Sequence, residues 1–484
     1  MAARGRPLKP AGRGGRAWCS IPLLLGLASC ATGVAVQRAD LPVASTTSRP
    51  SSQAVAAQVQ STGPRGRLSA AQREQLLVRL GQQGSANRLN RHLAAMAQLD
   101  DVDLHAQNEA RLLVDGPATF QAMFEAIEAA RHTVLLQSYI IDDSEVAQRL
   151  GALLARKRAQ GVQVLMLYDS VGSIGTSEAY FEGLRAAGIV TCAFNPLNPL
   201  KRMGYWDINH RDHRKILVVD RELGFVGGIN ISGVYSSGSF TRSWAAAPAD
   251  PRKSGWRDTQ VRLQGSVAAP LDDLVRQTWT RQGCQGALPP APKPAATKLA
   301  AGSHVVRIVP SSPADESSRI YTLLLSAVDT SQHSIYLTMA YFAPGQDMIN
   351  ALSDAARRGV DVQLVLPSLS DFAPLLYAGR RYYQGLLEAG GKLHEMRDAV
   401  MHAKTAVIDG VVSTVGSSNM DWRSFASNDE VNAVILGEDF GDTMTAMFKR
   451  DVAASQHITP QSWAQRSWLQ RSKEMLAGVF ERAW

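Results

Sequence analysis

One pattern of polar residues occurs twice, each time inside a hydrophobic run of the kind that forms a buried β-strand. The two copies are "DHRKILVVDRELGFVGGIN" (212–230) and "MHAKTAVIDGVVSTVGSSN" (401–419). Each copy has a histidine, a lysine two positions later and an aspartate five positions after the lysine. The residues are His213, Lys215 and Asp220 in the first copy, and His402, Lys404 and Asp409 in the second. A pattern of this length, repeated in this way, indicates a duplicated unit, so the fold must hold two similar halves.

The sequence that precedes each copy is repeated as well. "HTVLLQSYII" (132–141) and "RAQGVQVLMLYDS" (158–170) precede the first copy, as "HSIYLTMAYF" (333–342) and "RRGVDVQLVLPS" (357–368) precede the second. In each half, an apolar β-branched run is followed by an amphipathic helical stretch, a Gly-Val turn and another apolar run. This order is typical of βαβ units with strands buried on both faces. The predicted fold class is α/β, with two similar lobes of mixed, largely parallel sheets flanked by helices.

The rest of the sequence predicts how the lobes are connected. "GALPPAPKPAATKLAAG" (286–302), with four prolines, is expected to be a linker between lobes that span residues 105–285 and 303–484. Residues 65–104, before the first lobe, are expected to be largely helical. Ser69 is the predicted N-cap of the first helix in this segment.

The first 30 residues resemble an export signal. A basic start is followed by "IPLLLGLASCATG", a short apolar run that ends in small residues. Leu27-Ala28-Ser29-Cys30 is similar to the lipobox of bacterial lipoproteins, in which the cysteine becomes the lipidated N-terminus; an ordinary secretory signal with a chance cysteine at Cys30 is the alternative. Residues 31–64, rich in Ser, Thr, Ala and Gln, are expected to be a flexible tether. These features predict a membrane-anchored lipoprotein of the bacterial cell envelope that faces the periplasm, and they leave open whether the inner or the outer membrane holds it.

The charge of the chain excludes one class of partner. The formal net charge is +8, and five basic residues without an acid in the first 29 residues supply most of it. The body therefore lacks the dense basic surface of nucleic-acid-binding proteins, and no nucleic acid is expected as a partner. No internal run of about 18 apolar residues is present, so no transmembrane helix is predicted in the mature body.

The repeated pattern suits phosphate chemistry. On a strand, residues two apart point to the same face, so each histidine projects together with its lysine, whereas the aspartate has the opposite parity. Asp220 and Asp409 are therefore expected to hold a strand or a neighbouring loop in place. A glycine-rich turn after each aspartate supplies small polar residues, Asn230 in the first copy and Ser417 and Asn419 in the second. Two histidines, two lysines and two asparagines suit a phosphodiester, whose anionic oxygens need cationic and dipolar stabilisation.

Such a set of residues can exchange the ester bond of a phosphodiester. One histidine attacks phosphorus, and the other protonates the departing alkoxide and then deprotonates the incoming hydroxyl. The lysines supply the positive charge, so neither a metal site nor a cofactor is predicted. The acids expected to orient the histidines are Asp258 in "GWRDTQVRLQG" and Glu430 in "SNDEVNAVILG", each at the start of a strand-like run. Solvated acids at strand ends are the alternative.

Three further features allow more than one interpretation. Cys192 and Cys284 could pair in an oxidising compartment, although their spacing does not establish it. The C-terminal segment, residues 459–484, predicts an amphipathic helix that lies at a membrane interface or docks on the second lobe. Tyr205 and Trp206 are expected to line the site entrance or to pack between the lobes.

The two copies resemble the HKD motifs (here 213–230 and 402–419) of the phospholipase D superfamily, and the resemblance covers most of the chain from about residue 105 onward. "FNPLNP", "NHRDHRKILVVD", "GGINIS", "WRDTQVRLQG", "HAKTAVIDGVVSTVGSSNMDWRSF" and "NDEVNAVI" are most similar to the bacterial cardiolipin synthases. The resemblance implies two lobes related by a pseudo-twofold axis, with one active site between them. It also implies phosphatidyl transfer through a phosphohistidine, with His213 as the nucleophile and His402 as the acid/base. The implied partners are a membrane surface and the substrates phosphatidylglycerol and phosphatidylethanolamine.

The motifs do not decide the acceptor. With water as acceptor the chain would be a phospholipase D hydrolase that releases phosphatidic acid, because the choice depends on how well the site excludes water. A phosphodiesterase acting on DNA is a further alternative, which the small charge of the body disfavours. A non-catalytic binding protein is less consistent with two intact motifs. The lipobox-like signal replaces the N-terminal membrane helices of many synthases, so the donor and acceptor lipids are left open.

Overall fold

The computed structural model describes Arg38, Leu41 and residues 49–81, 84–198, 207–239, 252, 255–293 and 301–481. The predicted signal with Cys30 and the pair Tyr205 and Trp206 lie outside these residues. Within the described ranges, every helix is too short or too polar to cross a membrane.

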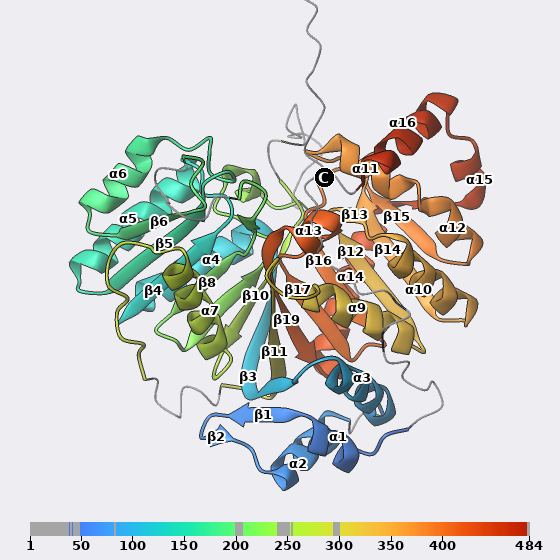
Figure 1. The fold of residues 1–484 in the computed structure, drawn as a ribbon, viewed down its shortest axis with the longest axis horizontal. Coiled ribbons are helices and arrows are strands. Elements are labelled where there is room, and N and C mark those ends of the chain that lie inside the picture. Colours follow the sequence, from blue (N-terminus) through green and yellow to red (C-terminus); the bar gives the residue numbers. More distant parts are fainter. Residues whose placement is uncertain are drawn as a thin grey trace, which may run out of the picture. The chain divides into compact units, whose positions relative to one another are not determined.

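The first lobe is a sheet covered by helices (Figure 1). Its strands follow the order β6-β5-β4-β8-β9-β10-β3 across the sheet. The strands are β3 (Asp103–Val114), β4 (Thr133–Ser138), β5 (Gln163–Asp169), β6 (Val190–Phe194), β8 (Ile216–Val219), β9 (Leu223–Gly227) and β10 (Thr259–Gln264). The helices are α4 (Asp115–Ala129), α5 (Glu145–Ala159), α6 (Glu178–Ala186) and α7 (Ala268–Arg281), and a short strand β7 (Arg211–Asp212) and a 3-10 turn η3 (Gly233–Tyr235) flank the first motif.

The second lobe repeats this arrangement. Its strands follow the order β15-β14-β12-β16-β17-β19-β11, so each has a counterpart in the first lobe, and β20 is added beside β15. The strands are β11 (His304–Ser311), β12 (Ser334–Met339), β14 (Asp361–Pro367), β15 (Lys392–Met396), β16 (Lys404–Ile408), β17 (Val412–Gly416), β19 (Asn428–Leu436) and β20 (Ser455–Ile458), with a separate pair, β13 (Phe342–Ala343) and β18 (Met420–Asp421). The helices are α9 (Arg319–Thr330), α10 (Gln346–Arg357), α11 (Ala373–Arg380), α12 (Tyr383–Glu388), α13 (Trp422–Ala426), α14 (Glu438–Ala453), α15 (Pro460–Ala464) and α16 (Trp468–Val479). The shared strand order confirms the predicted duplication.

The two sheets are continuous with each other. Strand β11 pairs antiparallel with β19 of its own lobe and with β3 of the first lobe. The sheets are mixed, as predicted, but the expectation that they are largely parallel is wrong. Only the outer three strands of each lobe run parallel, and the other neighbours pair antiparallel. The reason is that each motif strand turns back directly into the next strand, as β8 does into β9, whereas a parallel neighbour requires a crossover helix.

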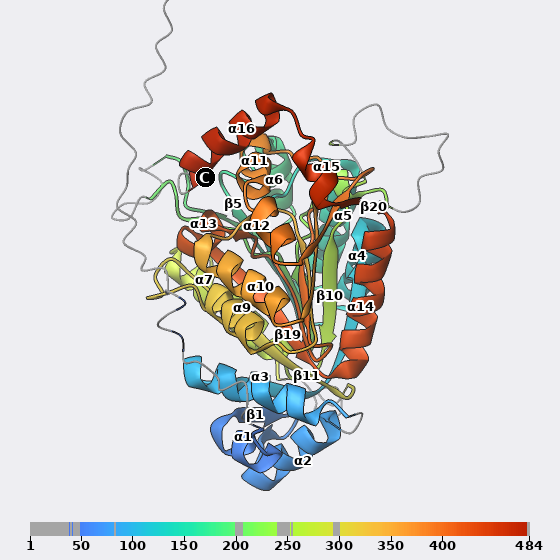
Figure 2. The same cartoon turned by 90° about the vertical axis from the view of Figure 1, so that its right-hand side faces the viewer.

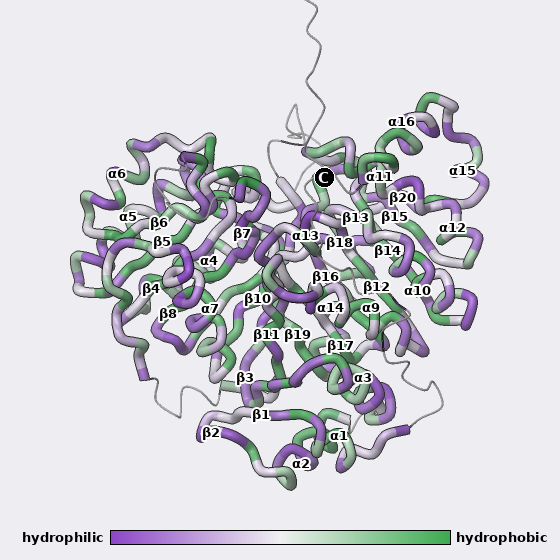
Figure 3. The backbone as a smooth tube through the Cα atoms, viewed as in Figure 1, coloured by the Kyte–Doolittle hydropathy of each residue, from purple (hydrophilic) through white to green (hydrophobic). Residues whose placement is uncertain are grey.

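Burial of the central strands explains their composition. All six residues of β4 and all nine of β19 are buried. Figure 2 shows why for the second lobe: α9 and α10 cover one face of the sheet and α14 covers the other. The hydropathy colouring in Figure 3 follows the same pattern, with hydrophobic residues along the central strands. Strands covered on both faces need near-continuous apolar runs, which is the signal the sequence carries.

The N-terminal segment is more ordered than expected. Helix α1 (Ser52–Gln58) and strand β1 (Gln60–Gly63) lie in the segment predicted to be a tether up to residue 64, and β1 pairs with β3. Upstream, the guanidinium of Arg38 binds Asp329 at 2.6 Å and Asp354 at 2.7 Å. The prediction of a flexible tether is therefore wrong from residue 49 onward and at Arg38, because ion pairs and a few buried aliphatic side chains hold a segment of low aromatic content.

The predicted helices that follow are present. Strand β2 (Gly66–Arg67) leads into α2 (Ala70–Leu80), whose N-cap is Ser69 in a capping box with Gln72, as expected. Helix α3 (Ala86–Leu99) then packs on α9 of the second lobe. The segment thus joins the hydrophobic core of the second lobe rather than forming a separate module.

Two buried arginines of the first lobe join the lobes. Arg257 forms a bidentate ion pair with Asp451 of α14, at 2.7 and 2.8 Å, and both side chains are fully buried. Arg214 donates to the backbone carbonyls of Glu430 at 3.1 Å and Ser311 at 3.3 Å. Removing one partner of a buried pair leaves an uncompensated charge, at a cost of about 3–5 kcal/mol. These contacts therefore hold the two lobes in one relative position, which the site between them requires.

The cysteine pair and the C-terminal segment also have definite places. Cys192 on β6 and Cys284 after α7 form a disulfide, with their Cα atoms 5.7 Å apart, so the pairing that the sequence left open is present. Thr459 caps α15, and α16 packs on α11 of the second lobe. Docking on the second lobe, one of the two alternatives for this segment, is therefore observed.

Candidate active site

The histidine of the first motif is positioned by the second lobe. Strand β7, just before His213, pairs in parallel with the start of β19, and the backbone N–H of His213 donates to the carbonyl of Asp429 at 2.9 Å. The next residue on β19 is Glu430, whose carboxylate oxygens lie 3.0 and 3.2 Å from His213 Nδ1. Both side chains are buried. The acid that orients the first histidine therefore comes from the other lobe.

The second motif shows the reciprocal arrangement. An isolated bridge joins Met401 to Arg257, and the backbone N–H of His402 donates to the carbonyl of Arg257 at 2.7 Å. The next residue is Asp258, whose carboxylate lies 2.7 Å from His402 Nδ1. Each histidine is thus hydrogen-bonded through its backbone to the residue before an acid, and through its ring to that acid. This equivalence between the lobes is what a pseudo-twofold axis requires.

The carboxylates determine which ring nitrogen faces the site. An Nδ1–H that donates to a carboxylate leaves Nε2 as the nitrogen with a free lone pair. Among the described residues, neither His213 Nε2 nor His402 Nε2 has a hydrogen-bond partner. Glu430 binds both His213 of the first motif and Ser417 of the second, so the two motifs meet across the boundary of the lobes. The site therefore presents two oriented imidazoles, each with Nε2 available for chemistry.

The lysines share the site, as their parity predicts. Lys215 Nζ donates to the carbonyl of His213 at 2.5 Å, and Lys404 Nζ donates to the carbonyl of His402. Burial lowers the pKa of Lys215 to about 7, and the charge of Glu430 counteracts this only in part. Burial also lowers the pKa of Lys404. An anionic ligand would favour the charged form of both ammonium groups, so the site has the electrostatic character of an anion receptor.

The histidines differ in their surroundings. Burial lowers the pKa of His213 well below its ordinary value, and the charges of Lys215 and Lys404 lower it further. Burial and the charge of Lys404 also lower the pKa of His402, but Asp258 counteracts them by charge and hydrogen bond. Burial raises the pKa of Glu430 to about 7. Before substrate enters, His213 is therefore held neutral, whereas Asp258 opposes the lowering of the pKa of His402.

The glycine-rich turns place their polar residues beside the acids. Ser417 Oγ donates to Glu430 at 2.5 Å. Gly228, at the equivalent position of the first motif, leaves room for Asp258, because a Cβ there would lie 2.2 Å from Asp258 Oδ1. Ser417 therefore orients an acid rather than facing the ligand.

The two asparagines differ in how they are bound. Asn230 accepts from the backbone N–H of Ile140 at 3.0 Å and donates to the hydroxyl of Tyr235 at 3.3 Å. Asn419 is buried, and its side-chain oxygen has no partner among the described residues. Asn419 is thus the better candidate for a hydrogen bond to substrate, and Asn230 is tied to the scaffold.

The motif aspartates lie away from the histidines. Asp220 follows β8, at the other end of that strand from His213, and accepts from the backbone N–H groups of residues 131–133 at 2.7–2.8 Å. Asp409 likewise accepts from residues 332–334 at 2.7–3.1 Å and binds His92 of α3 at 3.0 Å. These contacts match the supporting role that parity predicts, so we assign neither carboxylate to the catalytic set.

Several aromatic residues of the site were not expected from the sequence. Tyr139, at the end of β4, has its ring centroid 4.9 Å from that of His213, and Tyr341, at the equivalent end of β12, lies 6.4 Å from His402. Tyr235 Oη lies 3.1 Å from His402 Nδ1. A tyrosine at the carboxyl end of the first strand of each repeat was the available signal. It is a weak one, because aromatic residues at strand ends more often fill the core.

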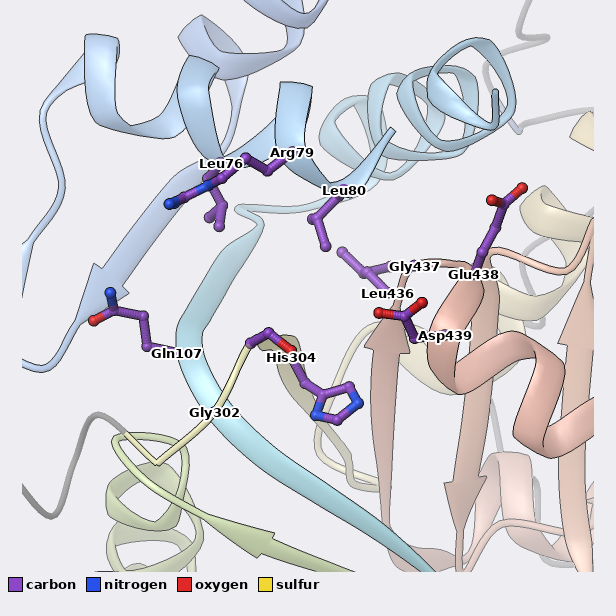
Figure 4. A pocket seen from close by; sticks show the side chains of 11 residues that line it. Leu76, Arg79, Leu80, Gln107, Gly302, His304, Leu436, Gly437, Glu438 and Asp439 are labelled. Carbon is purple, nitrogen blue, oxygen red and sulfur yellow. The ribbon is translucent and has the colours of Figure 1, made fainter. Parts of the chain in front are cut away.

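One hollow elsewhere in the protein does not belong to this site. It has a volume of about 400 Å³ and lies between the N-terminal segment and the second lobe (Figure 4). It is lined by Leu80, Gln107, His304 and the helix start at Gly437, which follows the end of β19 opposite to Glu430. Glu438 at its edge is paired with Arg88. The hollow holds one arginine, Arg79, and one imidazole, His304, and no residue of either motif lines it.

The chain matches a known protein family over both lobes. The family model described as "Cardiolipin synthase, PLD-like domain" matches residues 123–238 and 324–452, one match in each lobe. The chain is 35% identical over 375 residues to "Cardiolipin synthase A" of Pseudomonas entomophila, covering 76% of this chain and 74% of the relative. It is 34% identical over 376 residues to "Cardiolipin synthase" of Geobacillus thermodenitrificans, covering 77% and 71%.

A solved structure shows the same fold. The crystal structure of a phosphatidylserine synthase from Haemophilus influenzae matches with a TM-score of 0.58 at 11% identity, over 77% of this chain and 93% of that one. Since the identity is low, this likeness concerns the fold alone. Together with the reciprocal histidine–carboxylate pairs, the family match shows that the chain belongs to the cardiolipin synthase family of PLD-like domain proteins.

Proposed function

We propose that the protein is a phosphatidyltransferase that makes cardiolipin from two phospholipids through a phosphohistidine intermediate. The observation that carries the proposal is the reciprocal pairing of His213 with Glu430 and of His402 with Asp258, which leaves two Nε2 atoms and two buried lysines around one site. Relatives named cardiolipin synthase, which match most of the chain, support the reaction class.

In the first half-reaction, His213 Nε2 attacks the phosphorus of a bound phosphatidylglycerol. A nitrogen–phosphorus bond forms, and the bond from phosphorus to the glycerol headgroup oxygen breaks. The proton on His402 Nε2 passes to the departing alkoxide, so glycerol leaves as a neutral alcohol. Lys215 and Lys404 stabilise the negative charge on the equatorial oxygens during the transfer.

In the second half-reaction, the headgroup hydroxyl of a second phosphatidylglycerol attacks the phosphohistidine. His402, now neutral, takes the hydroxyl proton, and the nitrogen–phosphorus bond breaks. The product is cardiolipin, and both histidines return to their starting protonation states. Phosphatidylethanolamine in place of the first lipid would release ethanolamine by the same steps.

The roles of the two histidines follow the family resemblance, and the site electrostatics support them. A nucleophile must be neutral, and His213 has the more strongly lowered pKa of the pair, because burial and the two lysines disfavour its protonation. A general acid must carry a proton, and Asp258 favours the protonated form of His402. Glu430 and Asp258 orient the rings, and the side-chain N–H of Asn419 is proposed to donate to a phosphate oxygen.

The proposed place of the enzyme is the periplasmic face of a bacterial membrane, where Cys30 would carry an acyl anchor. The disulfide between Cys192 and Cys284 supports an oxidising compartment. The domain organisation proposed with it is a signal up to residue 30, a short connection to about residue 48, the helical segment, and two lobes joined by residues 286–302. Labelled palmitate should enter the wild type and be absent from Cys30→Ala.

The reaction is tested with purified full-length enzyme and vesicles of labelled phosphatidylglycerol, with and without phosphatidylethanolamine. Thin-layer separation is expected to show cardiolipin with release of free glycerol. Phosphatidic acid as the sole product would overturn the synthase proposal in favour of hydrolysis.

The histidine roles are tested with a phosphodiester lipid whose nitrophenol leaving group departs without protonation. His402→Ala is expected to form the covalent intermediate and to accumulate it, because the incoming hydroxyl is no longer deprotonated. His213→Ala is expected to form none. Mass spectrometry of the intact proteins reads out the adduct, and an adduct on His402 in the His213→Ala variant would reverse the assignment.

A further inference from the structure

Helix α16 carries an apolar face that is exposed along the length of the helix. Six large hydrophobic side chains of this helix and its C-cap are exposed, with Trp468 at 77%, Met475 at 68% and Val479 at 74%. The full set is Trp468, Leu469, Met475, Leu476, Val479 and Phe480. At 3.6 residues per turn these positions form one stripe along the helix, and Figure 3 shows the hydrophobic residues recurring along it. An exposed stripe of this size marks an interaction surface.

The charges of α16 are sorted around that stripe. Helical periodicity places Arg471 on one side of the stripe and Lys473 on the other, and both are exposed. The acids lie on the opposite face, where they are held against the protein: Glu474 is buried and paired with Arg466 at 3.0 Å, and Glu481 binds Arg381 at 3.2 Å. The outward surface of the helix is thus apolar at its centre and cationic along its borders.

The inward face of α16 connects the helix to the active site. Ala477 packs in one cluster with Leu375 and Ala378 of α11 and with Ala343 of β13. Strand β13 directly follows Tyr341, whose ring faces His402. Only one helix and one short strand therefore separate the apolar stripe from the catalytic histidine, and Figures 1 and 2 both show α16 beside α11.

Most of the other exposed large hydrophobic residues border the same site. They lie in loops after β5, β6 and β14 and just before β7, at Ile174, Leu197, Ile208, Leu369 and Phe372. His213 precedes β8, which is antiparallel to β4, so it lies at the carboxyl end of β4, the edge from which the β5 and β6 loops emerge. The β5 loop touches Tyr139, since a Cβ on Gly172 would lie 2.3 Å from the Tyr139 carbonyl oxygen. Within the described residues, Val78 on α2 is the exception to this distribution.

We infer that the α16 stripe and these rim loops form one membrane-docking face that sets the mouth of the active site on an anionic phospholipid bilayer. This inference rests on the proposed function, because it takes the substrates to be lipids of that bilayer. Tryptophan and aliphatic side chains would enter the headgroup and upper acyl region, while Arg471 and Lys473 would lie at the level of the phosphates. Lipid headgroups would then reach the histidines without leaving the interface. A second copy of this chain is the competing occupant, but no described acidic cluster on α16 complements its exposed cations.

Hydrogen exchange on the full-length protein tests the docking face, because it reports on each segment whether or not an acyl anchor is present. Vesicles of phosphatidylglycerol are expected to slow amide exchange in residues 468–480 and in the loops at Ile174 and Phe372, and vesicles of phosphatidylcholine should do so less. The segment around Val78 serves as the internal control and should not change. Equal exchange of α16 with and without anionic vesicles would overturn the inference.

Activity supplies an independent readout. In the double variant Leu476→Ser/Val479→Ser, the ratio of turnover on vesicles to turnover on a monomeric short-chain lipid should fall about tenfold or more, because two aliphatic side chains no longer enter the interface. Val78→Ser, an exchange at a residue that is also exposed (47%), should leave the ratio unchanged. Membrane docking would be refuted by an unchanged ratio of vesicle to monomeric-lipid turnover in the double variant. It would also be refuted if the wild type formed a dimer that dissociates in the double variant. If α16 is protected by vesicles while no cardiolipin forms, the docking face stands and the proposed reaction fails.

Discussion

The aspartate of the second motif allows a sharp test, since we assign it to the scaffold and not to the chemistry. Asp409 is buried, and its carboxylate accepts from His92 at 3.0 Å and from the backbone N–H groups of His333 at 2.7 Å and Ser334 at 3.1 Å. Burial alone would raise its pKa, but these hydrogen bonds outweigh it and lower the pKa from 3.8 to about 2. A fall of the pKa from 3.8 to about 2, at roughly 1.4 kcal/mol per pKa unit, corresponds to about 2–3 kcal/mol of stability.

Asp409→Asn should therefore lower the free energy of unfolding at pH 7 by about 2–3 kcal/mol, with turnover per folded molecule largely retained. The pH dependence follows from the lowered pKa. Stabilisation by the carboxylate is complete above about pH 4, where the unfolded chain is ionised, and it disappears as pH falls through about 2, where the folded carboxyl takes up a proton. The difference between wild type and variant should accordingly narrow between pH 4 and pH 2.

Urea unfolding followed by tryptophan fluorescence measures the stability, and the cardiolipin assay measures turnover on the same preparations. His402→Ala is the comparison variant and should abolish turnover. If Asp409→Asn kept its unfolding midpoint but lost turnover by about a hundredfold, the size of a general acid–base contribution, Asp409 would act in the reaction and the scaffold assignment would be wrong.

Three further outcomes are expected. Asp258→Asn removes the group that favours the protonated form of His402, so the pKa of that ring falls further. The alkaline limb of the pH–rate profile should therefore move to lower pH. An unchanged alkaline limb would contradict the assignment of His402 as the acid. Gly228→Ala leaves every polar group in place but puts a Cβ 2.2 Å from Asp258 Oδ1, so turnover should drop with little change in lipid binding. Wild-type turnover in this variant would show that catalysis does not depend on the position of the Asp258 carboxylate. The double variant Cys192→Ser/Cys284→Ser removes a disulfide that joins two residues 92 positions apart in the sequence. Its free energy of unfolding should be about 4–5 kcal/mol lower than that of the wild type, while the site stays intact. A stability equal to that of the wild type would mean that the disulfide contributes nothing.

The sequence predicts the local parts of this site well. The two-residue spacing between His213 and Lys215 places both on one face, and the opposite parity of Asp220 separates it from them, as the structure shows. The duplication is also predictable, because buried strands require apolar runs that repeat visibly. These inferences depend on the backbone geometry of a few neighbouring residues, which periodicity reports directly.

Long-range partners are not predictable in the same way. Asp258 and Glu430 are recognisable as acids at strand starts, but nothing in the periodicity assigns each to the histidine of the other lobe, 144 and 217 residues away. Arg38 is a similar case, since its partners on α9 and α10 lie about 300 residues further along the chain. Such contacts depend on how the two lobes pack against each other, and the periodicity of a single sequence does not predict that interface.

The exchange of acids between the lobes has a consequence for how the protein is made. Synthesis proceeds from the N-terminus, so the first lobe is complete long before Glu430 emerges. Until then His213 has no carboxylate to orient its ring, and Asp258 has no histidine to orient. A half-made or truncated chain therefore lacks the pair of oriented histidines. The site is therefore complete only when strands of both lobes are in place, so assembly of the second lobe is what makes the chain competent.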